Sequence, residues 1–520
     1  MNLISSSGPR WPAHRIARPA MAQLAALVLL VMMLCAARAQ AQVSTAPAFD
    51  SQATWRVLSR LGYGPSASLV QAVNAAGGAK PWALAQLDLA YQASQQLPAI
   101  PAAWADFNAP LTSTFKGFQK ERELRRTLKE DRPSPQNGAA AMEPAPGVRA
   151  QTFSRDLARE AAAWRLASCS QSEIENPLLA RMTEFWFNHL NVYAGKGAVR
   201  PFVGHYDVNV IRAHAMGRFE DLLLASARHP AMLFYLDQAQ SVATGSGGAR
   251  GQSRGLNENY ARELMELHTL GVNGGYTQND VRELARVLTG WTVNPRDDSG
   301  FRFAPRLHDQ GEKNVLGQRY SERSAASGQT QGEEAIRMLA RQSATAHRIA
   351  LRLAQFFVSD QPSSALVDRL TQSFLASGGD TRALLRSLIE SSEFWQADQK
   401  LFKTPLDYAC SVLSVTHESG EPVDKAYLRQ IAQTLGFLSN AGQPMHGWQT
   451  PDGYKTDAAT WLAPEALTRR ADFALTLARR EREPEWLKPF LSTATLQSIA
   501  TEVAPLRAGL MLASPDFMYK

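Results

Sequence analysis

Acidic and imidazole side chains are concentrated in one stretch of the sequence, residues 255–291. Carboxyl and imidazole groups are the commonest general acids and bases in proteins, because their surroundings readily bring their pKa values near neutral pH. The stretch directly follows the glycine-rich segment 243–256, which would let a ligand approach the start of a helix closely. We therefore predict a site for proton transfer or polar-ligand binding here. Its candidate catalytic residues are Glu258, Glu263, Glu266 and His268, and its candidate ligand-binding residues are Asn257, Arg262 and Trp291.

A second candidate catalytic group, His308 and Asp309, lies in the segment 293–332, which is too polar and too poor in periodicity for a helix. Loops of this length are uncommon in compact domains and are more often functional or disordered than structural. We predict that this pair meets the carboxylates of 255–291 in one cleft, within roughly 10 Å, the span of paired carboxylates in glycoside hydrolases. Further ligand-binding candidates are Asn188, His189 and His214.

Purely structural roles compete with these assignments. Arg262 can form an ion pair with Glu258 on a solvated helix face, and Trp291 can be an ordinary core residue. His189 falls on an apolar helical stripe with Phe185, which suits a buried core histidine. Both kinds of role remain open from the sequence.

No metal site is predicted. The sequence contains no HExxH motif, no Glu followed three residues later by His, and no Cys/His cluster at zinc spacing. The sequence does not determine whether the protein binds a cofactor.

Two helices joined by a glycine turn are expected to position the residues of 255–291. Asn257 can cap the first helix, and Gly271 ends it. Thr277 can cap the second helix, with Asp280 three residues later as a variant capping box. The buried stripes are expected to be Ala261, Leu264, Met265 and His268 in the first helix and Val281, Leu284, Ala285 and Leu288 in the second.

Helical periodicity recurs almost everywhere after residue 50, whereas alternating strand patterns are rare. We predict a mainly α fold, a large multi-helix body with long loops and little or no sheet. Residues 42–520 are expected to form a single helical domain, with a flexible low-complexity insertion at 132–150. Further helices are expected at 335–358, 364–376, 380–391, 402–416, 424–435 and 464–480.

The N-terminus has the pattern of a secretory signal peptide. Three arginines precede the apolar run 21–37, and small residues follow it at 37–41. The run is short against the roughly 20 residues that span a bilayer, so we expect cleavage of residues 1–41 and no later membrane span. The mature chain is expected to be periplasmic or extracellular.

The charge balance of the mature chain excludes a strong electrostatic footprint for nucleic acid. The full chain has 55 basic and 48 acidic side chains. Its first 41 residues hold four arginines and no acidic residue, which leaves 51 against 48. Two cysteines remain, Cys169 and Cys410. They can form a disulfide in an oxidising compartment or stay as two buried thiols.

Several motifs together resemble the bacterial family catalogued as domain of unknown function 1800. They are VLSRLGYGP, MTEFWFNHLNV, the central stretch 255–291, HDQGEKNVLG and GQPMHGW. The resemblance covers nearly the whole mature chain. One departure is Phe187, where the family's related segment more often reads Trp-His-Asn-His, and its loss weakens any proposal of a metal pair there.

The resemblance implies a secreted helical protein, frequently encoded beside a protein of the domain of unknown function 1501 family, which resembles exported sulfatase or phosphatase-like hydrolases. It implies no activity. Two hypotheses follow. In the first, the chain is an exported enzyme or binding protein for a polar ligand, for instance a carbohydrate. In the second, it is a non-catalytic partner or chaperone of the neighbouring hydrolase.

Overall fold

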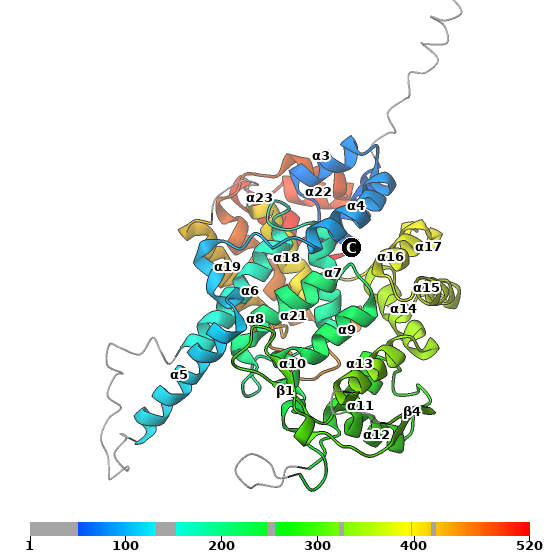
Figure 1. Ribbon diagram of the computed structural model, residues 1–520. Coiled ribbons are helices and arrows are strands. Elements are labelled where there is room, and N and C mark those ends of the chain that lie inside the picture. The colour runs from blue at the N-terminus through cyan, green and yellow to red at the C-terminus, as the bar shows by residue number, and fades with distance from the viewer. Residues whose placement is uncertain (1–49, 131–151, 247–254, 322–326, 397, 418–422) are drawn as a thin grey trace, which may run out of the picture. The chain divides into compact units, whose positions relative to one another are not determined.

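Amphipathic sequence patterns form helices along most of the described chain (Figure 1). The computed structural model describes residues 50–130, 152–246, 255–321, 327–396, 398–417 and 423–520. The mainly α prediction is confirmed. The predicted signal peptide 1–41 and the predicted insertion 132–150 lie outside the described residues, as do residues 247–254 of the glycine-rich segment. No helix within the described ranges is long and apolar enough to span a bilayer.

Six helices form the N-terminal third: α2 (Ser51–Arg60), α3 (Ala67–Ala75), α4 (Ala79–Ser94), α5 (Leu111–Glu130), α6 (Phe153–Ser170) and α7 (Pro177–His189). The middle third contains α8 (Val203–Tyr206), a π-helical turn (Asp207–Arg212), α9 (Phe219–Arg228), α10 (Pro230–Tyr235), α11 (Asn259–Glu263), a second π-helical turn (Leu264–His268) and α12 (Gln278–Leu288).

The remaining helices are α13 (Ser327–Ala340), α14 (Ser343–Phe357), α15 (Ser364–Ser377), α16 (Thr381–Glu390), α17 (Ser392–Trp395), α18 (Pro405–Thr416), α19 (Lys425–Asn440), α20 (Ala458–Trp461), α21 (Pro464–Leu477), α22 (Thr493–Ala500), α23 (Ala504–Ala513) and α24 (Pro515–Met518). Helices α15, α16, α18, α19 and α21 correspond to the helices predicted at 364–376, 380–391, 402–416, 424–435 and 464–480, whereas α17, α20 and α22–α24 were not predicted. One difference is that 335–358 is two helices, because Gln342 adopts an extended backbone (φ −67°, ψ 146°) between α13 and α14.

The predicted capping box is present at the start of α12. Thr277 Oγ1 accepts a hydrogen bond from the Asp280 amide at 3.2 Å, and Asp280 Oδ2 accepts from the Thr277 amide at 2.8 Å. The predicted stripe of α12 is fully buried. The first predicted helix is different, because only Asn259–Glu263 is α-helical and the backbone then widens into the π-helical turn. Such turns occur frequently at functional sites.

The polar segment 293–332 contains two small antiparallel hairpins. Strand β1 (Trp291–Val293) pairs with β2 (Phe301–Phe303), and β3 (Lys313–Val315) pairs with β4 (Gln318–Tyr320). Leu316 and Gly317 turn the second hairpin with positive φ angles of 50° and 83°, as a tight hairpin turn requires. Strands of three residues are too short for an alternating pattern to show in the sequence.

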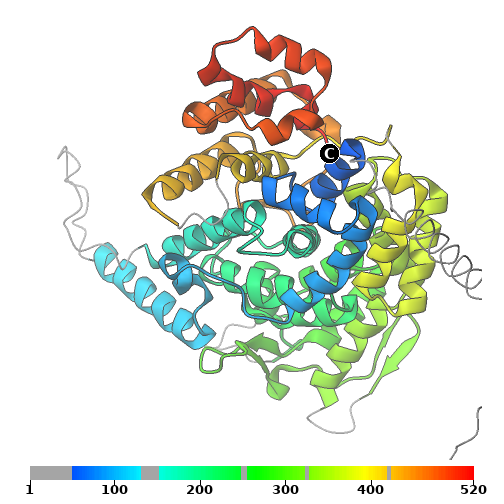
Figure 2. The same ribbon diagram turned by 90° about the horizontal axis from the view of Figure 1, so that it is seen from above.

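Two apolar clusters form the core of residues 50–520. The first joins α2, α4, α7 and α9 to α12–α16, and the second joins α6 to α18, α19, α21 and α23. The two ends of this unit meet, since the Trp55 ring of α2 lies 5.8 Å from the rings of Phe490 and Phe517. Figure 2 shows the orange-to-red C-terminal helices grouped beside the blue N-terminal ones.

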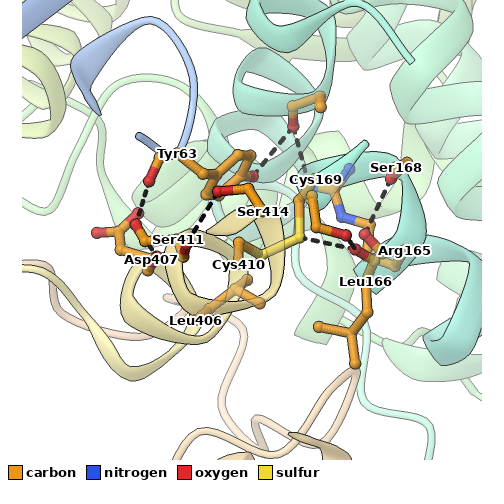
Figure 3. The surroundings of a disulfide bond; sticks show 12 residues. Tyr63, Arg165, Leu166, Ser168, Cys169, Leu406, Asp407, Cys410, Ser411 and Ser414 are labelled. Atoms are coloured by element: carbon orange, nitrogen blue, oxygen red, sulfur yellow. Dashed lines mark hydrogen bonds between the residues drawn. A yellow bond between two sulfur atoms is a disulfide. The ribbon is translucent and has the colours of Figure 1, made fainter. Parts of the chain in front are cut away.

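A disulfide joins α6 to α18. Cys169 and Cys410 have Cα atoms 5.7 Å apart and are separated by 241 residues in sequence (Figure 3). The sequence left their pairing open, because only the packing of α6 on α18 brings them into range. The same two helices supply Arg165 and Asp407, whose side chains appear beside the disulfide in Figure 3.

Replacing both cysteines by serine is expected to lower the free energy of unfolding by about 2–5 kcal/mol, because a long loop is no longer closed in the unfolded chain. Urea unfolding of the wild type and of the Cys169→Ser/Cys410→Ser variant would measure the difference. Reducing agent should shift the wild type towards the variant and leave the variant unchanged. Equal unfolding midpoints for the two proteins would contradict this expectation.

Candidate functional site

The carboxylates predicted on the first helix of the central stretch lie along its surface, around Arg262. Arg262 forms ion pairs with Glu258 at 3.5 Å and with Glu266 at 3.4 Å, and Glu258 also accepts a hydrogen bond from Gln278 Nε2 at 2.7 Å. These partly exposed pairs contribute little stability each. They tie the start of α11 to the start of α12, and a catalytic role for the two carboxylates stays a prediction.

Glu263 has a different environment from its neighbours. Burial raises its pKa, and the nearby carboxylates of Glu266 and Asp452 raise it further against the opposing effect of Arg262. Burial, followed by Glu263 and Asp452, also raises the pKa of Tyr235. Glu263 is therefore a predicted carboxylate that lies close to the segment around Asp452.

His268 and His189 meet in the core. Both are at most 1% exposed, and His189 Nε2 lies 3.0 Å from the carbonyl oxygen of His268, so Nε2 carries the proton. One ring nitrogen of each histidine, His189 Nδ1 and His268 Nε2, is buried without a hydrogen-bond partner among the described residues. Burial, together with the nearby Arg348 and Arg352, lowers the pKa of His189 strongly and that of His268 to about 3.

The protein is expected to lose stability between pH 6.5 and pH 4.5. An unfolded histidine takes up a proton near pH 6.5, whereas folded His268 stays neutral to about pH 3. The unfolded chain therefore binds more protons in this window, and acid favours it. For His268 alone the loss by pH 4.5 is about 2 kcal/mol.

Urea unfolding at the two pH values would measure this loss. The His268→Gln variant isolates the contribution, because it should show a smaller difference between the two pH values than the wild type. Identical pH dependence in the two proteins would argue against a neutral buried His268.

His308 and Asp309 are held at the other end of α12. His308 Nδ1 donates to the Thr289 carbonyl oxygen at 2.8 Å, and Asp309 accepts from Arg286 Nε at 2.9 Å and NH2 at 3.0 Å. Burial raises the pKa of Asp309, but Arg286, the Gly311 amide and Lys313 together keep the pKa below its usual range. Glu258 contacts Gln278 at the start of α12, and 11 helical residues span about 16 Å. These contacts place Glu258 at one end of α12 and the His308–Asp309 pair at the other end, so they do not bring the two into one cleft.

Three other predicted ligand-binding residues have structural contacts. Trp291 is fully buried, with its ring 5.1 Å from that of Phe301. His214 Nδ1 donates to the Val210 carbonyl oxygen at 2.8 Å. Asn257 Oδ1 accepts from the Asn259 amide at 2.9 Å. The prediction that Asn257 caps the helix is wrong by one residue, because α11 begins at Asn259 and Glu258 occupies the capping position.

Asn188, a predicted ligand-binding residue, lies at a site whose other residues were not predicted from the sequence. Its side chain donates to the Tyr454 carbonyl oxygen at 2.9 Å and accepts from the Tyr454 amide at 2.8 Å, so it pairs with the backbone of 443–454 like a strand. Asn191 donates to the Thr450 carbonyl oxygen at 2.8 Å. Gly453 allows this close approach, since a Cβ there would lie 2.1 Å from the Asn188 carbonyl oxygen and φ is 74°.

A small cavity of about 50 Å³ lies between segment 443–454 and the end of α7. Its apolar lining includes Phe187, Leu406, Met445 and Trp448, and its polar lining includes Arg165, Glu184, Asn188, Asn191, Gln443, His446 and Tyr454. The volume is that of one or two water molecules, so it fits one functional group of a ligand rather than a whole sugar.

His446 and Asp207 form a buried pair at this cavity. His446 Nε2 lies 3.2 Å from Asp207 Oδ2, and the Asp207 carboxylate must accept this hydrogen bond, so Nε2 carries the proton. His446 Nδ1 then presents a lone pair, and it has no hydrogen-bond partner among the described residues. Arg165 Nε lies 4.0 Å from Asp207 Oδ2. Burial lowers the pKa of Arg165, but Asp207 together with Tyr63, Glu184 and Tyr454 raises it overall.

The backbone at both members of the pair is unusual. His446 has φ 52°, a left-handed conformation that is uncommon for a residue with a side chain. Asp207 begins the π-helical turn Asp207–Arg212. Strained backbone and π-helical turns both cluster at functional sites. The Phe187 ring also packs 5.0 Å from the His446 ring, so the position where the family resemblance led us to expect histidine lies against this pair.

Glu184 connects the cavity to a buried charge network. It accepts hydrogen bonds from Tyr63 Oη at 2.6 Å, from Arg181 NH1 at 2.9 Å, and from Tyr454 Oη. Burial, together with Glu184, raises the pKa of both tyrosines well above the usual range. Both hydroxyls therefore remain protonated donors to this carboxylate.

Asp407 is the second carboxylate of the network. It accepts a hydrogen bond from Arg181 and another from Lys520 Nζ at 2.6 Å. Burial raises the pKa of Asp407, but these two cations outweigh it and hold the pKa well below its usual range. The network joins α7, α18 and Lys520 next to the cavity.

No metal site emerges, because the described residues contain no group of three or more His, Cys, Asp or Glu side chains placed to hold an ion.

A family model described as "Protein of unknown function (DUF1800)" matches residues 56–519. The chain belongs to the DUF1800 family. The match contains every residue of the cavity and of the His446–Asp207 pair, so this site is built entirely from the DUF1800 region. Comparison with curated proteins and comparison with solved structures gave no match.

Proposed function

We propose that this DUF1800 protein is an exported enzyme in which His446 acts as a general base, oriented by Asp207, on a polar group bound under segment 443–454. The observation that carries the proposal is the buried Nδ1 of His446, a residue that lines the cavity. This nitrogen has no hydrogen-bond partner among the described residues, and the other ring nitrogen is held by a carboxylate. A base held in one tautomer by a carboxylate is the arrangement that general-base catalysis uses.

The remaining polar lining suits binding and orientation of a hydroxyl or a water molecule. Tyr454 Oη and Glu184 form a donor and acceptor pair at the cavity, and Arg165 supplies a positive charge beside Asp207. Trp448 adds a flat apolar surface of the kind that packs against sugar rings. These features favour a polar substrate with an apolar face, such as a carbohydrate.

Export is part of the proposal. It rests on the signal-peptide pattern of residues 1–41 and is supported by the Cys169–Cys410 disulfide, since such bonds persist in oxidising compartments.

The test is a panel of 4-nitrophenyl esters, glycosides, sulfates and phosphates, incubated with the purified mature protein and with its His446→Gln variant. We expect release of nitrophenol from at least one class by the wild type and its loss in the variant. Absence of release from every class by a folded wild type would count against catalysis.

The alternative proposal is a non-catalytic partner of a neighbouring exported hydrolase of the domain of unknown function 1501 family. It predicts a stable one-to-one complex on co-purification of the two proteins, and an activity of that complex that is insensitive to His446→Gln.

A further inference from the structure

A second cleft, of about 320 Å³, adjoins the cavity and shares Asn188 and Tyr454 with it. Three cationic side chains line it, Arg348, Arg352 and Lys455. Arg348 and Arg352 are four residues apart on α14, so they project from the same face of one helix. Like charges at this spacing repel each other, and this placement therefore costs helix stability unless something neutralises them.

Neither guanidinium group forms an ion pair with a described residue, although Asp452 lies near enough to Arg352 to raise its pKa against the effect of burial. Arg348 Nε donates to the Leu267 carbonyl oxygen at 3.0 Å, which is a neutral acceptor. Arg352 forms no hydrogen bond or ion pair with any residue that the structure describes, although it is partly buried. Removing a charge from water without a partner costs several kcal/mol by general estimates, so proteins usually provide one.

Carboxylates are present in the cleft, but they are engaged with other groups. Asp360 Oδ2 accepts from the Ala458 amide at 3.0 Å, and Asp457 Oδ1 accepts from the Thr460 amide at 3.0 Å. Asp452 Oδ1 accepts from Thr450 Oγ1 at 2.5 Å. Within the described residues, none of the three forms an ion pair with a lysine or arginine. They organise the loop 450–460, and Asp452 offsets the charge of Arg352 only in part.

We propose that this cleft binds a small ligand through a phosphate, sulfate or carboxylate group held by Arg352 and Arg348. The guanidinium fork matches two oxygen atoms of such a group, and the bonds are strengthened by charge. The apolar walls, Phe185, Leu351 and Phe356, exclude water and so strengthen the attraction.

The electrostatics of the cleft agree with this assignment. Burial, and then Arg348, lowers the pKa of Arg352 to about 10. The neighbouring His189 and His268 are kept neutral, in part by the same two arginines. A bound anion offsets the repulsion between the two guanidinium groups.

Calorimetric titration of the mature protein with sodium phosphate, sodium sulfate or sodium acetate, each at an ionic strength matched with sodium chloride, tests the proposal. We expect saturable binding of at least one anion by the wild type. Arg352→Met should weaken it at least about tenfold, the loss expected for a hydrogen bond between charged groups. Arg282→Met removes an exposed arginine of α12 and should bind like the wild type. The preferred anion identifies the ligand group.

Two results would overturn the proposal: no saturable binding of any of the three anions by the wild type, or equal affinities for the wild type and Arg352→Met. Arg352→Lys keeps the charge and removes the fork, so it should bind with intermediate affinity and guards against a Met variant that fails to fold. The cleft proposal does not depend on catalysis by His446, because His446→Gln should leave anion binding intact.

Discussion

Replacing His446 with glutamine is expected to lower kcat by about 10²–10⁴-fold, the usual contribution of a general base. Glutamine keeps an amide N–H that can donate to Asp207 but has no basic nitrogen to present to the cavity. The loss should therefore appear in kcat on whichever substrate the panel identifies, with a smaller change in KM. Steady-state kinetics across pH would measure both.

His347→Gln is the matched control, since His347 is an exposed histidine of α14. It should leave kcat unchanged. Asp207→Asn provides a second check, because Asp207 acts through the orientation of His446 and its loss should also reduce kcat without removing the base. A His446→Gln variant with a native circular dichroism spectrum and full activity would refute the proposed role.

Replacing Arg181 with methionine is expected to lower the free energy of unfolding by about 3–5 kcal/mol. Arg181 is fully buried, bonds to both Glu184 and Asp407, and lies over the Phe356 ring at 4.3 Å. Methionine fills much of the same volume, but it leaves two buried carboxylates with fewer compensating charges. Urea unfolding of wild type and variant would measure the loss.

Arg319→Met is the control for this prediction. Arg319 is 80% exposed and its partner Glu312 is 64% exposed, so its loss should cost less than about 1 kcal/mol. A combined Arg181→Met/Glu184→Gln/Asp407→Asn variant removes both orphaned charges and should recover part of the stability. An Arg181→Met variant as stable as the wild type would show that the network contributes nothing net to folding.

The sequence was most informative where local rules act alone. The Thr277–Asp280 capping box and the buried stripe of α12 follow from spacings of three and four residues, which the helix geometry fixes. The Glu258–Arg262 ion pair follows from the same geometry. The mainly α class is the sum of many such local patterns.

The candidate site was less accessible, because its parts are distant in sequence. Asp207 and His446 are 239 residues apart, and no spacing motif can represent their pairing. The available signals were Asn188, selected for its polar face beside Glu184, and His446, which lies inside the motif GQPMHGW. Neither reveals that His446 meets Asp207, because that contact depends on how segment 443–454 folds over α7.

The sequence by itself determined the helices, their caps, the signal-peptide pattern and the resemblance to DUF1800, since these depend on neighbouring residues or on whole motifs. Only the tertiary structure decided that Cys169 meets Cys410, that His189 and His268 lie in the core, and that Arg352 lines a cleft without an ion pair among the described residues. The physical reason is that burial and pairing between distant segments set the charge state and availability of a side chain, and both depend on the packing of helices that periodicity identifies but does not place.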